Sequence, residues 1–305
     1  MVTRHSRGKI VWVDLESPTR QELREVMQEF SIDARIEEEI AHATPYPLVI
    51  SSLKYSYLIL HFPTTEATGG ARSQEIDFIV GKQFLITSRY EAINSIHNLH
   101  KVFEAEELLG LPGVMHSGDA LLERIMRRMY GALREEVETI GTRLERIERD
   151  IFGGKERETM RTISEANRIL LRFDTTLTRH EEALCSFLKE LLNPNLFGKK
   201  FEDRADRIEA ERAHVYALVN SFREVAGELR ETNDSLLSAS QNEVMKTLTV
   251  ITFIILPPTL IVELFRLGIP GLPATNDPDL FWVVLATIAI VTTFLVVYTK
   301  RKGWL

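Results

Sequence analysis

Polar side chains recur at helical spacing through an apolar stretch near the C-terminal end of the sequence. Steps of alternately three and four residues from position 242 to position 266 stay on one face of a helix. The residues on this face are Asn242, Met245, Thr249, Thr252, Leu256, Thr259, Glu263 and Arg266. An amide, hydroxyls and charges on one face of an otherwise apolar helix are typical of a helix that lines a water-filled pore. The pattern therefore predicts that this helix lines a pore or a cavity.

An alternative is that the threonine hydroxyls bond back to their own helix, which is common in membranes. For Thr249 alone this alternative is favoured. The complete stripe ends in the ionisable residues Glu263 and Arg266. Because charge inside a membrane is costly and usually functional, the complete stripe favours a pore or cavity.

Two apolar segments are long enough to cross a bilayer, which takes about 20 residues. They cover about 247–267 and 280–299, and the basic tail 300–305 follows the second. Lys246 and the cluster Lys300–Lys302 place positive charge on the same side of both spans, so both termini are expected to be cytoplasmic. The loop 268–279 is then periplasmic. Pro257 and Pro258 remove two helix hydrogen bonds and predict a sharp kink.

The composition of the whole chain excludes several classes of site and disfavours others. The net charge is −7, which disfavours binding to nucleic acid and would attract cations. The lone Cys185 excludes an intramolecular disulfide and a cysteine zinc site. The N-terminus has no apolar segment typical of a signal peptide. No arrangement of catalytic residues is recognisable, so the protein is not expected to be an enzyme, and His180 is interpreted as solvated helix surface.

Strands and helices alternate in the first part of the chain, which predicts an α/β domain over residues 1–90. Strands are expected at 9–15, 49–53, 55–62, 74–80 and 83–89, the last two joined by the Gly81-Lys82 turn. A helix is expected to start at Ser17-Pro18, with Ser17 as its cap, and a second at Asp33. A helical region, 91–198, follows, with helices at about 92–107, 118–151 and 157–192.

One long helix is predicted over residues 199–267, including the first membrane span. At 1.5 Å per residue it would be about 100 Å long, so it must pack on other helices. The stripe from Val215 to Leu236 is apolar apart from Asn233 and offers that contact. On another face lie Glu224, Glu228 and Glu231. Taken alone they suggest an exposed charged face, but joined to the threonine stripe they predict a cytoplasmic mouth that attracts cations.

The stretch NEVMKTLTVITFIILPPTLIVELF, 242–265, resembles the pore helix of the CorA family of divalent-cation transporters, which typically reads NEVMKxLT before an apolar run with a proline. The end, VVYTKRKGWL, is similar to the family's basic tail. VWVDLESPTRQEL, YLILHFP and IDFIVGKQFLITSRYE are similar to its cytoplasmic domain. The resemblance covers nearly the full length. The chain departs at the Gly-Met-Asn signature, where it has Arg266-Leu267-Gly268, and in this it is similar to the CmaX group.

The resemblance implies a funnel-shaped homopentamer in the bacterial inner membrane, with a cytoplasmic α/β domain, long helices and two transmembrane helices. It implies transport of a divalent cation, with Mg²⁺ favoured, and no other cofactor. Asn242, Met245, Thr252, Leu256 and Thr259 match pore-lining positions, and rings of Met245 and Leu256 would gate by dewetting. The altered outer mouth comprises Glu263, Arg266, Leu267 and Gly268.

Members of this family close when Mg²⁺ binds between cytoplasmic domains. Here Arg207 stands where an acidic residue is expected. Weak candidates for a regulatory metal site are Glu202, Asp203, Asp206 and Glu209.

Two other functions remain open. Without the Gly-Met-Asn motif, the chain could be a CorA-shaped scaffold or regulatory protein that has lost transport. It could also move Zn²⁺ or another divalent metal, although zinc-transporting relatives keep a Gly-x-Asn form that is absent here.

Overall fold

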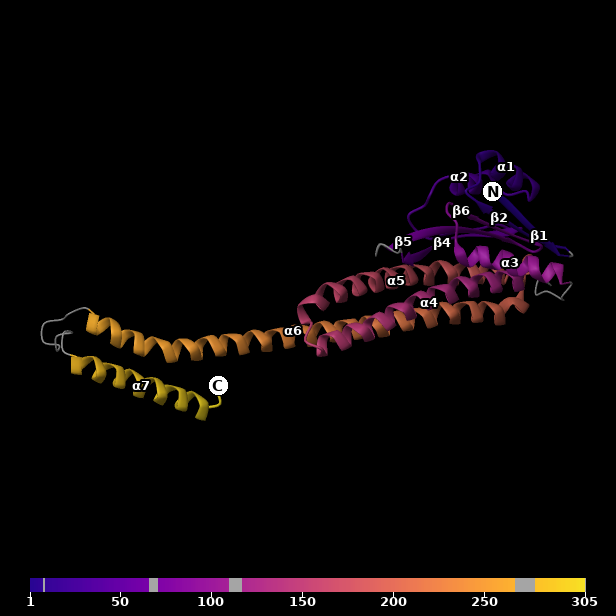
Figure 1. Cartoon of the computed structure of the whole chain (residues 1–305). Helices are drawn as coiled ribbons and strands as arrows, with labels where there is room; N and C mark the ends of the chain where they lie inside the picture. Colours follow the sequence, from indigo (N-terminus) through magenta and orange to yellow (C-terminus); the bar gives the residue numbers. More distant parts are fainter. Residues whose placement is uncertain (8, 66–70, 110–116, 267–277, 305) are drawn as a thin grey trace. The chain divides into compact units, whose positions relative to one another are not determined.

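The computed structural model describes residues 1–7, 9–65, 71–109, 117–266 and 278–304 (Figure 1). The chain forms two compact units, Met1–Arg230 and Glu231–Leu305. The division falls within helix α6, Glu202–Arg266. The boundaries expected at residues 90 and 198 therefore both lie inside the first unit.

The first unit contains a six-stranded sheet in the order β1-β2-β6-β5-β4-β3. The strands are β1 (Val2–Arg7), β2 (Ile10–Glu16), β3 (Leu48–Ser51), β4 (Tyr55–Thr65), β5 (Ala71–Gly81) and β6 (Phe84–Arg89). Neighbouring strands are antiparallel except β2 and β6, which are parallel. The hairpin of β5 and β6 was predicted, whereas β1 and its pairing with β2 were not.

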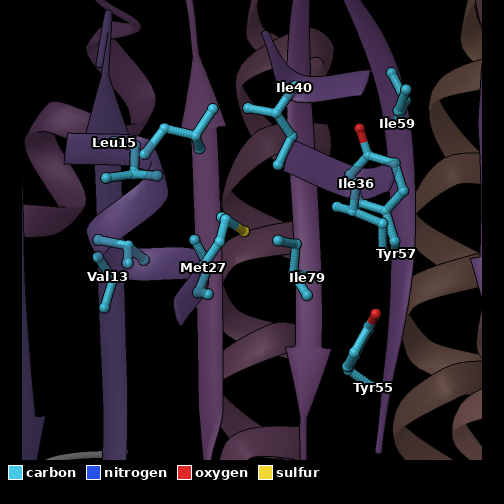
Figure 2. Packing of buried hydrophobic residues seen from close by; sticks show 12 residues of the cluster. Val13, Leu15, Met27, Ile36, Ile40, Tyr55, Tyr57, Ile59 and Ile79 are labelled. Carbon is cyan, nitrogen blue, oxygen red and sulfur yellow. The ribbon is translucent and has the colours of Figure 1, made fainter. Parts of the chain in front are cut away.

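Helices α1 (Arg20–Glu29) and α2 (Ala34–Ile40) cover one face of this sheet (Figure 1). Alternate residues of a strand point to the same face, so Val13 and Leu15 of β2 reach Met27 of α1 and Ile36 and Ile40 of α2 (Figure 2). All are nearly inaccessible to solvent. This hydrophobic core fixes the sheet to the two short helices.

The start of α1 differs from the prediction. Its cap is Thr19, whose side chain accepts from the backbone N–H of Glu22, while the Glu22 carboxylate accepts from the Thr19 N–H. This reciprocal capping box satisfies two helix-end donors and outcompetes Ser17. Ser17 adopts a φ of 43° and donates its hydroxyl to the carbonyl of Tyr90. The expected start of α2 is confirmed, because the Asp33 side chain caps it.

The opposite face of the sheet carries helices α4 (Gly118–Phe152) and α5 (Glu156–Leu191) (Figure 1). His180 of α5 is fully buried there, so its assignment to solvated surface was wrong. Its Nε2 donates to the His61 carbonyl at 2.9 Å, and its Nδ1 accepts from the Tyr130 hydroxyl at 3.1 Å. Burial lowers the pKa of His180 to about 3, so the ring is neutral. His180 is buried because it lies on the apolar face of α5 together with Leu177 and Leu184.

Helix α3 (Asn94–Leu108) precedes α4, and the short helix η1 (Lys199–Phe201) leads into α6. The first part of α6 packs through the predicted stripe, since Val215, Val219 and Ala226 are buried. A Cβ atom on Gly141 of α4 would lie 2.3 Å from the Phe222 ring of α6. The glycine therefore permits the close approach of these two helices.

The second unit contains the last part of α6 and helix α7, Pro278–Arg301. Val250 of α6 and Leu295 and Thr299 of α7 are buried, and the Lys246 ammonium donates to the Gly303 carbonyl at 2.8 Å. Both helices contain a segment long and apolar enough to cross a membrane, and little of either segment is buried. A core helix of a soluble protein would instead be mostly buried.

The buried Asp77 carboxyl of β5 predicts how the free energy of unfolding changes with pH. The carboxyl is 1% exposed and accepts the Tyr57 hydroxyl at 2.7 Å. Burial raises the pKa of Asp77 from 3.8 to about 8. Between these values the folded chain keeps a proton that the unfolded chain has lost. Raising the pH from about 4 to about 8 should therefore cost stability, with a slope of up to about 1.4 kcal/mol per pH unit.

The variant Asp77→Asn keeps an acceptor for Tyr57 and removes the titration. We expect the unfolding free energy of the wild type to fall more steeply with pH than that of the variant, as measured by urea unfolding at pH 5, 6, 7 and 8. Other titrating groups, such as His180, contribute equally to both proteins. Parallel curves for the two proteins would show that Asp77 is ionised in the folded state.

Candidate pore helix and polar clusters

The predicted pore residues lie on sides of α6 that α7 leaves uncovered. Asn242, Met245, Thr249, Thr252, Leu256 and Thr259 are all exposed in the single chain. Lys246 and Val250, one turn apart, face α7 instead. Met245 is 60% and Leu256 56% exposed, which is unusual for large apolar side chains unless lipid or another chain covers them.

The three threonine hydroxyls all donate to their own helix. Thr249, Thr252 and Thr259 bond to the carbonyls of Met245, Leu248 and Ile255 at 2.8, 2.9 and 2.8 Å. Back-bonding, the alternative to a pore, is therefore present. These hydrogen bonds use only the hydroxyl protons, and each hydroxyl oxygen still has lone pairs that can accept from water. The stripe can bond to its own helix and face water at the same time.

Pro257 and Pro258 lie inside α6, which continues through them to Arg266. Neither proline has an N–H group, so the carbonyls of Phe253 and Ile254 lose their usual helical donors. These carbonyls need another donor, such as water, within a membrane. The sharp kink expected at the two prolines stays a prediction.

The outer end of the stripe carries the anticipated ion pair. Arg266 Nη1 lies 3.5 Å from Glu263 Oε1, and both side chains are exposed. Leu267 and Gly268, the other two outer-mouth residues, lie outside the described residues, as does most of the loop 268–279.

The acidic residues expected at the other mouth are also accessible. Glu224, Glu228 and Glu231 are exposed, and among the described residues none of them forms an ion pair. No described residue of this chain therefore neutralises their carboxylates.

The candidates for a regulatory metal site differ in their surroundings. Glu202, Asp203 and Asp206 are exposed. Glu209 instead accepts from Nε and Nη2 of Arg212, at 2.8 and 2.5 Å. Within the part of the chain that the structure describes, no group of three or more His, Cys, Asp or Glu side chains could hold a metal ion.

Arginines of α6 occupy an acidic cluster on α4. Arg207 Nε lies 2.6 Å from Glu123, and Arg204 contacts Glu123 at 2.5 Å and Asp119 at 3.0 Å. The hydrogen bond from Arg207, with that from Arg204, lowers the pKa of Glu123 despite its burial. The two guanidinium groups supply the positive charge that an ion would otherwise bring to these carboxylates.

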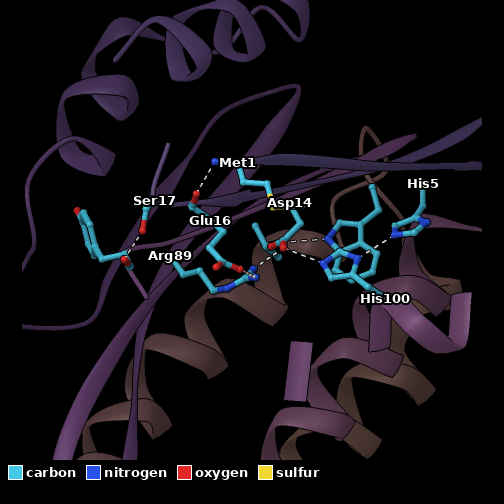
Figure 3. Close-up of polar contacts among 10 residues, drawn as sticks. Met1, His5, Asp14, Glu16, Ser17, Arg89 and His100 are labelled. Carbon is cyan, nitrogen blue, oxygen red and sulfur yellow. Dashed lines mark hydrogen bonds and ion pairs between the residues drawn. The ribbon is translucent and has the colours of Figure 1, made fainter. Parts of the chain in front are cut away.

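A buried polar cluster that the sequence does not predict lies between β2, β6 and α3 (Figure 3). Asp14 Oδ1 accepts from Thr87 at 2.6 Å, and Oδ2 contacts His100 Nε2 at 2.7 Å and the Arg89 guanidinium. His100 Nδ1 lies 2.8 Å from His5 Nε2. Burial alone would raise the pKa of Asp14, but the bonds from His100, Arg89 and Thr87 outweigh it and lower that pKa.

The local signal for this cluster is the charged Asp14 between the apolar residues Val13 and Leu15 of β2. Its partners follow from the parallel register, which sets Asp14 opposite Thr87 and Glu16 opposite Arg89. Arg89 also bonds to Glu16 at 2.6 Å. The cluster joins the sheet to α3 through the contact between Asp14 and His100. We interpret it as structural.

Comparison with known proteins relates this arrangement to one family. Residues 7–301 match the model of the family described as CorA-like Mg²⁺ transporter protein. The cobalt/magnesium transport protein CorA of Methanocaldococcus jannaschii is 21% identical over 299 residues, which cover 97% of this chain and 92% of that protein.

Two solved structures share the fold. The complete structure of the CorA magnesium transporter from Methanocaldococcus jannaschii has a TM-score of 0.84 at 20% identity and covers 99% of this chain and 93% of its own. The full-length CmaX protein has a TM-score of 0.68 at 16% identity, with 97% and 89% covered. At these identities the structures establish the fold alone. Since the family model spans the α/β domain, the long helices and both apolar helices, the chain belongs to the CorA-like Mg²⁺ transporter family.

Proposed function

We propose that the protein is a homopentameric channel for divalent cations, with Mg²⁺ as its principal ion, and not an enzyme. The last part of α6 from each of five copies would line the pore, and α7 would lie outside. Both termini would be cytoplasmic in a bacterial inner membrane, because Lys246 and Lys300–Lys302 mark one side of both spans. The Methanocaldococcus relative is named a cobalt/magnesium transport protein, which supports this choice of cargo.

The exposure of the polar stripe on α6 is the main support for this proposal. The stripe from Asn242 to Thr259 stays exposed although α7 packs against the side of α6 that bears Val250. Lipid is a poor environment for an amide, and no other part of the described structure covers the stripe. Copies of α6 arranged around an axis would place this face on water.

The chemistry of the stripe suits a hydrated ion. Mg²⁺ gives up its water reluctantly, so a Mg²⁺ pore needs groups that bond to the ion's water shell. The hydroxyl oxygens of the threonines and the amide of Asn242 can do so. Glu224, Glu228 and Glu231 would concentrate cations at the cytoplasmic end. Glu202, Asp203 and Asp206 stay candidates for a regulatory Mg²⁺ site between subunits.

Flux into liposomes tests this function. Purified protein would be reconstituted, and uptake of Mg²⁺, Co²⁺, Ni²⁺ and Zn²⁺ compared with uptake into empty liposomes. Native mass spectrometry of the same preparation should give five copies. Flux of Mg²⁺ supports the proposal, whereas preference for Zn²⁺ would change the cargo. A dimer or monomer as the largest stable species would refute the pentameric pore.

The ion pair at the altered outer mouth favours a second candidate, a scaffold or regulatory protein that has lost transport. Arg266 stands where the family's signature begins, and its pairing with Glu263 leaves an entrance without the net negative charge that would attract a cation. A pentamer that moves none of the four ions would support this alternative.

The two apolar residues of the stripe predict how the pore closes. Rings of Met245 and Leu256 would exclude water, so replacing either by Ser should wet the constriction and raise the leak conductance several-fold. Single-channel recording in planar bilayers would measure it. Val244→Ser is a matched control, because Val244 is also exposed but lies off the stripe. Unchanged conductance in both stripe variants, with intact pentamers, would place the constriction elsewhere.

A further inference from the structure

A cavity of about 740 Å³ lies in the first unit between the middle of α5, the segment after α2 and the adjoining parts of β4 and β5. Small-molecule sites in proteins are typically roughly 300–1,000 Å³. No residue of the predicted pore or of the candidate regulatory site lines it. The cavity is therefore built from other residues than the predicted ion pathway.

One wall of the cavity is basic. Arg168, Arg172 and Arg179 of α5 line it, and at offsets of four and eleven residues they share one helix face. They extend over about 16 Å at 1.5 Å per residue. Among the described residues, none of the three forms an ion pair or hydrogen bond. Three unpaired guanidinium groups on one wall favour a ligand with several negative charges.

The opposite end of the cavity offers acceptors. Glu75 is 8% exposed, and its Oε2 accepts from the Thr44 N–H at 2.8 Å, while its Oε1 has no partner in the described structure. His61 donates from Nε2 to the Thr44 carbonyl at 2.5 Å, and the same nitrogen lies 3.4 Å from Glu75 Oε2, while its Nδ1 is buried without a hydrogen-bond partner in the described structure. A buried acceptor without a donor is uncommon, so Glu75 Oε1 marks a place where a donor is missing.

The remaining lining is largely apolar and includes Pro45, Leu171 and the Tyr90 ring. Tyr90 is fixed by its hydroxyl, which donates to the Ile40 carbonyl at 2.9 Å. A fixed aromatic residue in the lining is suited to the flat face of a heterocycle. Glu91 also lines the cavity and adds a second carboxylate, so the lining is not uniformly positive.

We propose that this cavity binds a nucleoside polyphosphate whose base carries an exocyclic amino group, such as an adenine or cytosine nucleotide. The phosphates would bond to Arg168, Arg172 and Arg179, the base would lie near Tyr90, and its amino group would donate to Glu75. An inorganic phosphate would leave the acceptors unpaired, and an amino acid has too few negative charges for three arginines. The ligand would act on the first unit, and its binding requires no ion transport.

Isothermal titration calorimetry of the full-length protein in detergent, with ADP as the probe, tests the proposal. The wild type should bind ADP. The double variant Arg168→Gln/Arg172→Gln should weaken binding at least tenfold. Arg157→Gln is the matched control, because Arg157 is exposed on α5 outside the cavity, and it should bind as the wild type does.

Glu75→Gln distinguishes a nucleotide from its phosphates. Gln keeps an acceptor for the Thr44 N–H, so folding should be preserved, and circular dichroism would verify it. We expect this variant to weaken ADP about tenfold and to leave pyrophosphate unchanged. If pyrophosphate binds the wild type as tightly as ADP and Glu75→Gln changes neither, the site recognises phosphate alone and the nucleotide assignment is wrong.

Two further outcomes would overturn the proposal. One is the absence of ADP binding to the wild type at millimolar concentration. The other is equal ADP binding by the wild type and the double arginine variant. If the double variant instead alters the oligomer in native mass spectrometry while the wild type binds no ADP, the basic face is a contact between subunits. Ion flux is not a readout here, so this test and that of the pore can fail independently.

Discussion

Replacing Arg266 with Gln is expected to raise Mg²⁺ flux into liposomes about tenfold, and replacing Glu263 with Gln is expected to lower it. In the proposed pentamer each residue forms a ring at the outer end of α6. Arg266 cannot release its proton at usable pH, so its charge is balanced only by Glu263, which lies 3.5 Å away. The wild-type entrance is then close to neutral.

The expected size of the change in Mg²⁺ flux follows from Coulomb's law. A divalent ion about 10 Å from one guanidinium, at an effective dielectric constant of ~20, is repelled by roughly 3 kcal/mol. Salt and solvent reduce this, since both side chains are exposed. A residual effect of about 1.4 kcal/mol corresponds to a factor of ten in rate. The arginine variant exposes a ring of carboxylates that attracts Mg²⁺, and the glutamate variant exposes the guanidinium ring.

Arg20→Gln is the matched control, because Arg20 is exposed at the start of α1, far along the chain from both spans. Flux through this control should equal that of the wild type. Raising the ionic strength should shrink the difference between the variants. Flat flux in Arg266→Gln, or increased flux in Glu263→Gln, would contradict the electrostatic account of the entrance.

Features set by neighbouring residues could be predicted from the sequence. The hairpin at Gly81-Lys82 and the long helices are present within a few residues of the predicted bounds. The pore stripe is likewise local, since helical spacing alone places its members on one face. The structure shows that this face is exposed in one chain. Its role as a pore lining stays a prediction, because it depends on copies of the chain that meet only in an oligomer.

Features set by distant residues could not be predicted. Strand β2 is parallel to β6, more than 70 residues later, and this register brings Arg89 to Asp14. His180 is buried because α5 packs on β4, although its neighbour Glu181 is exposed. The arginine-lined cavity likewise joins α5 to β5, about 100 residues apart. In each case the residue can be recognised in the sequence, but only the tertiary fold shows which distant residue it contacts.

Asp14 provides the largest expected change in stability. Its carboxylate is the buried counter-charge of Arg89, whose side chain is only 3% exposed. Removing one partner of a buried ion pair typically costs about 3–5 kcal/mol, because the other charge stays buried without compensation. Arg89 would keep the ion pair with Glu16, a partly exposed partner at 2.6 Å. We therefore expect Asp14→Ala to lower the unfolding free energy of the first unit by about that amount.

Glu29→Ala is the control, because Glu29 pairs with Arg4 at 2.7 Å with both side chains nearly half exposed. Exposed pairs contribute about 0–1 kcal/mol, so this variant should be nearly as stable as the wild type. Trp12 stacks on His100 at 4.3 Å and reports directly on the cluster. Urea unfolding would be followed by Trp12 fluorescence in a background where Trp282 and Trp304 are replaced by Phe. If Asp14→Ala costs no more than Glu29→Ala, water or Glu16 compensates Arg89, and the cluster does not hold β2, β6 and α3 together.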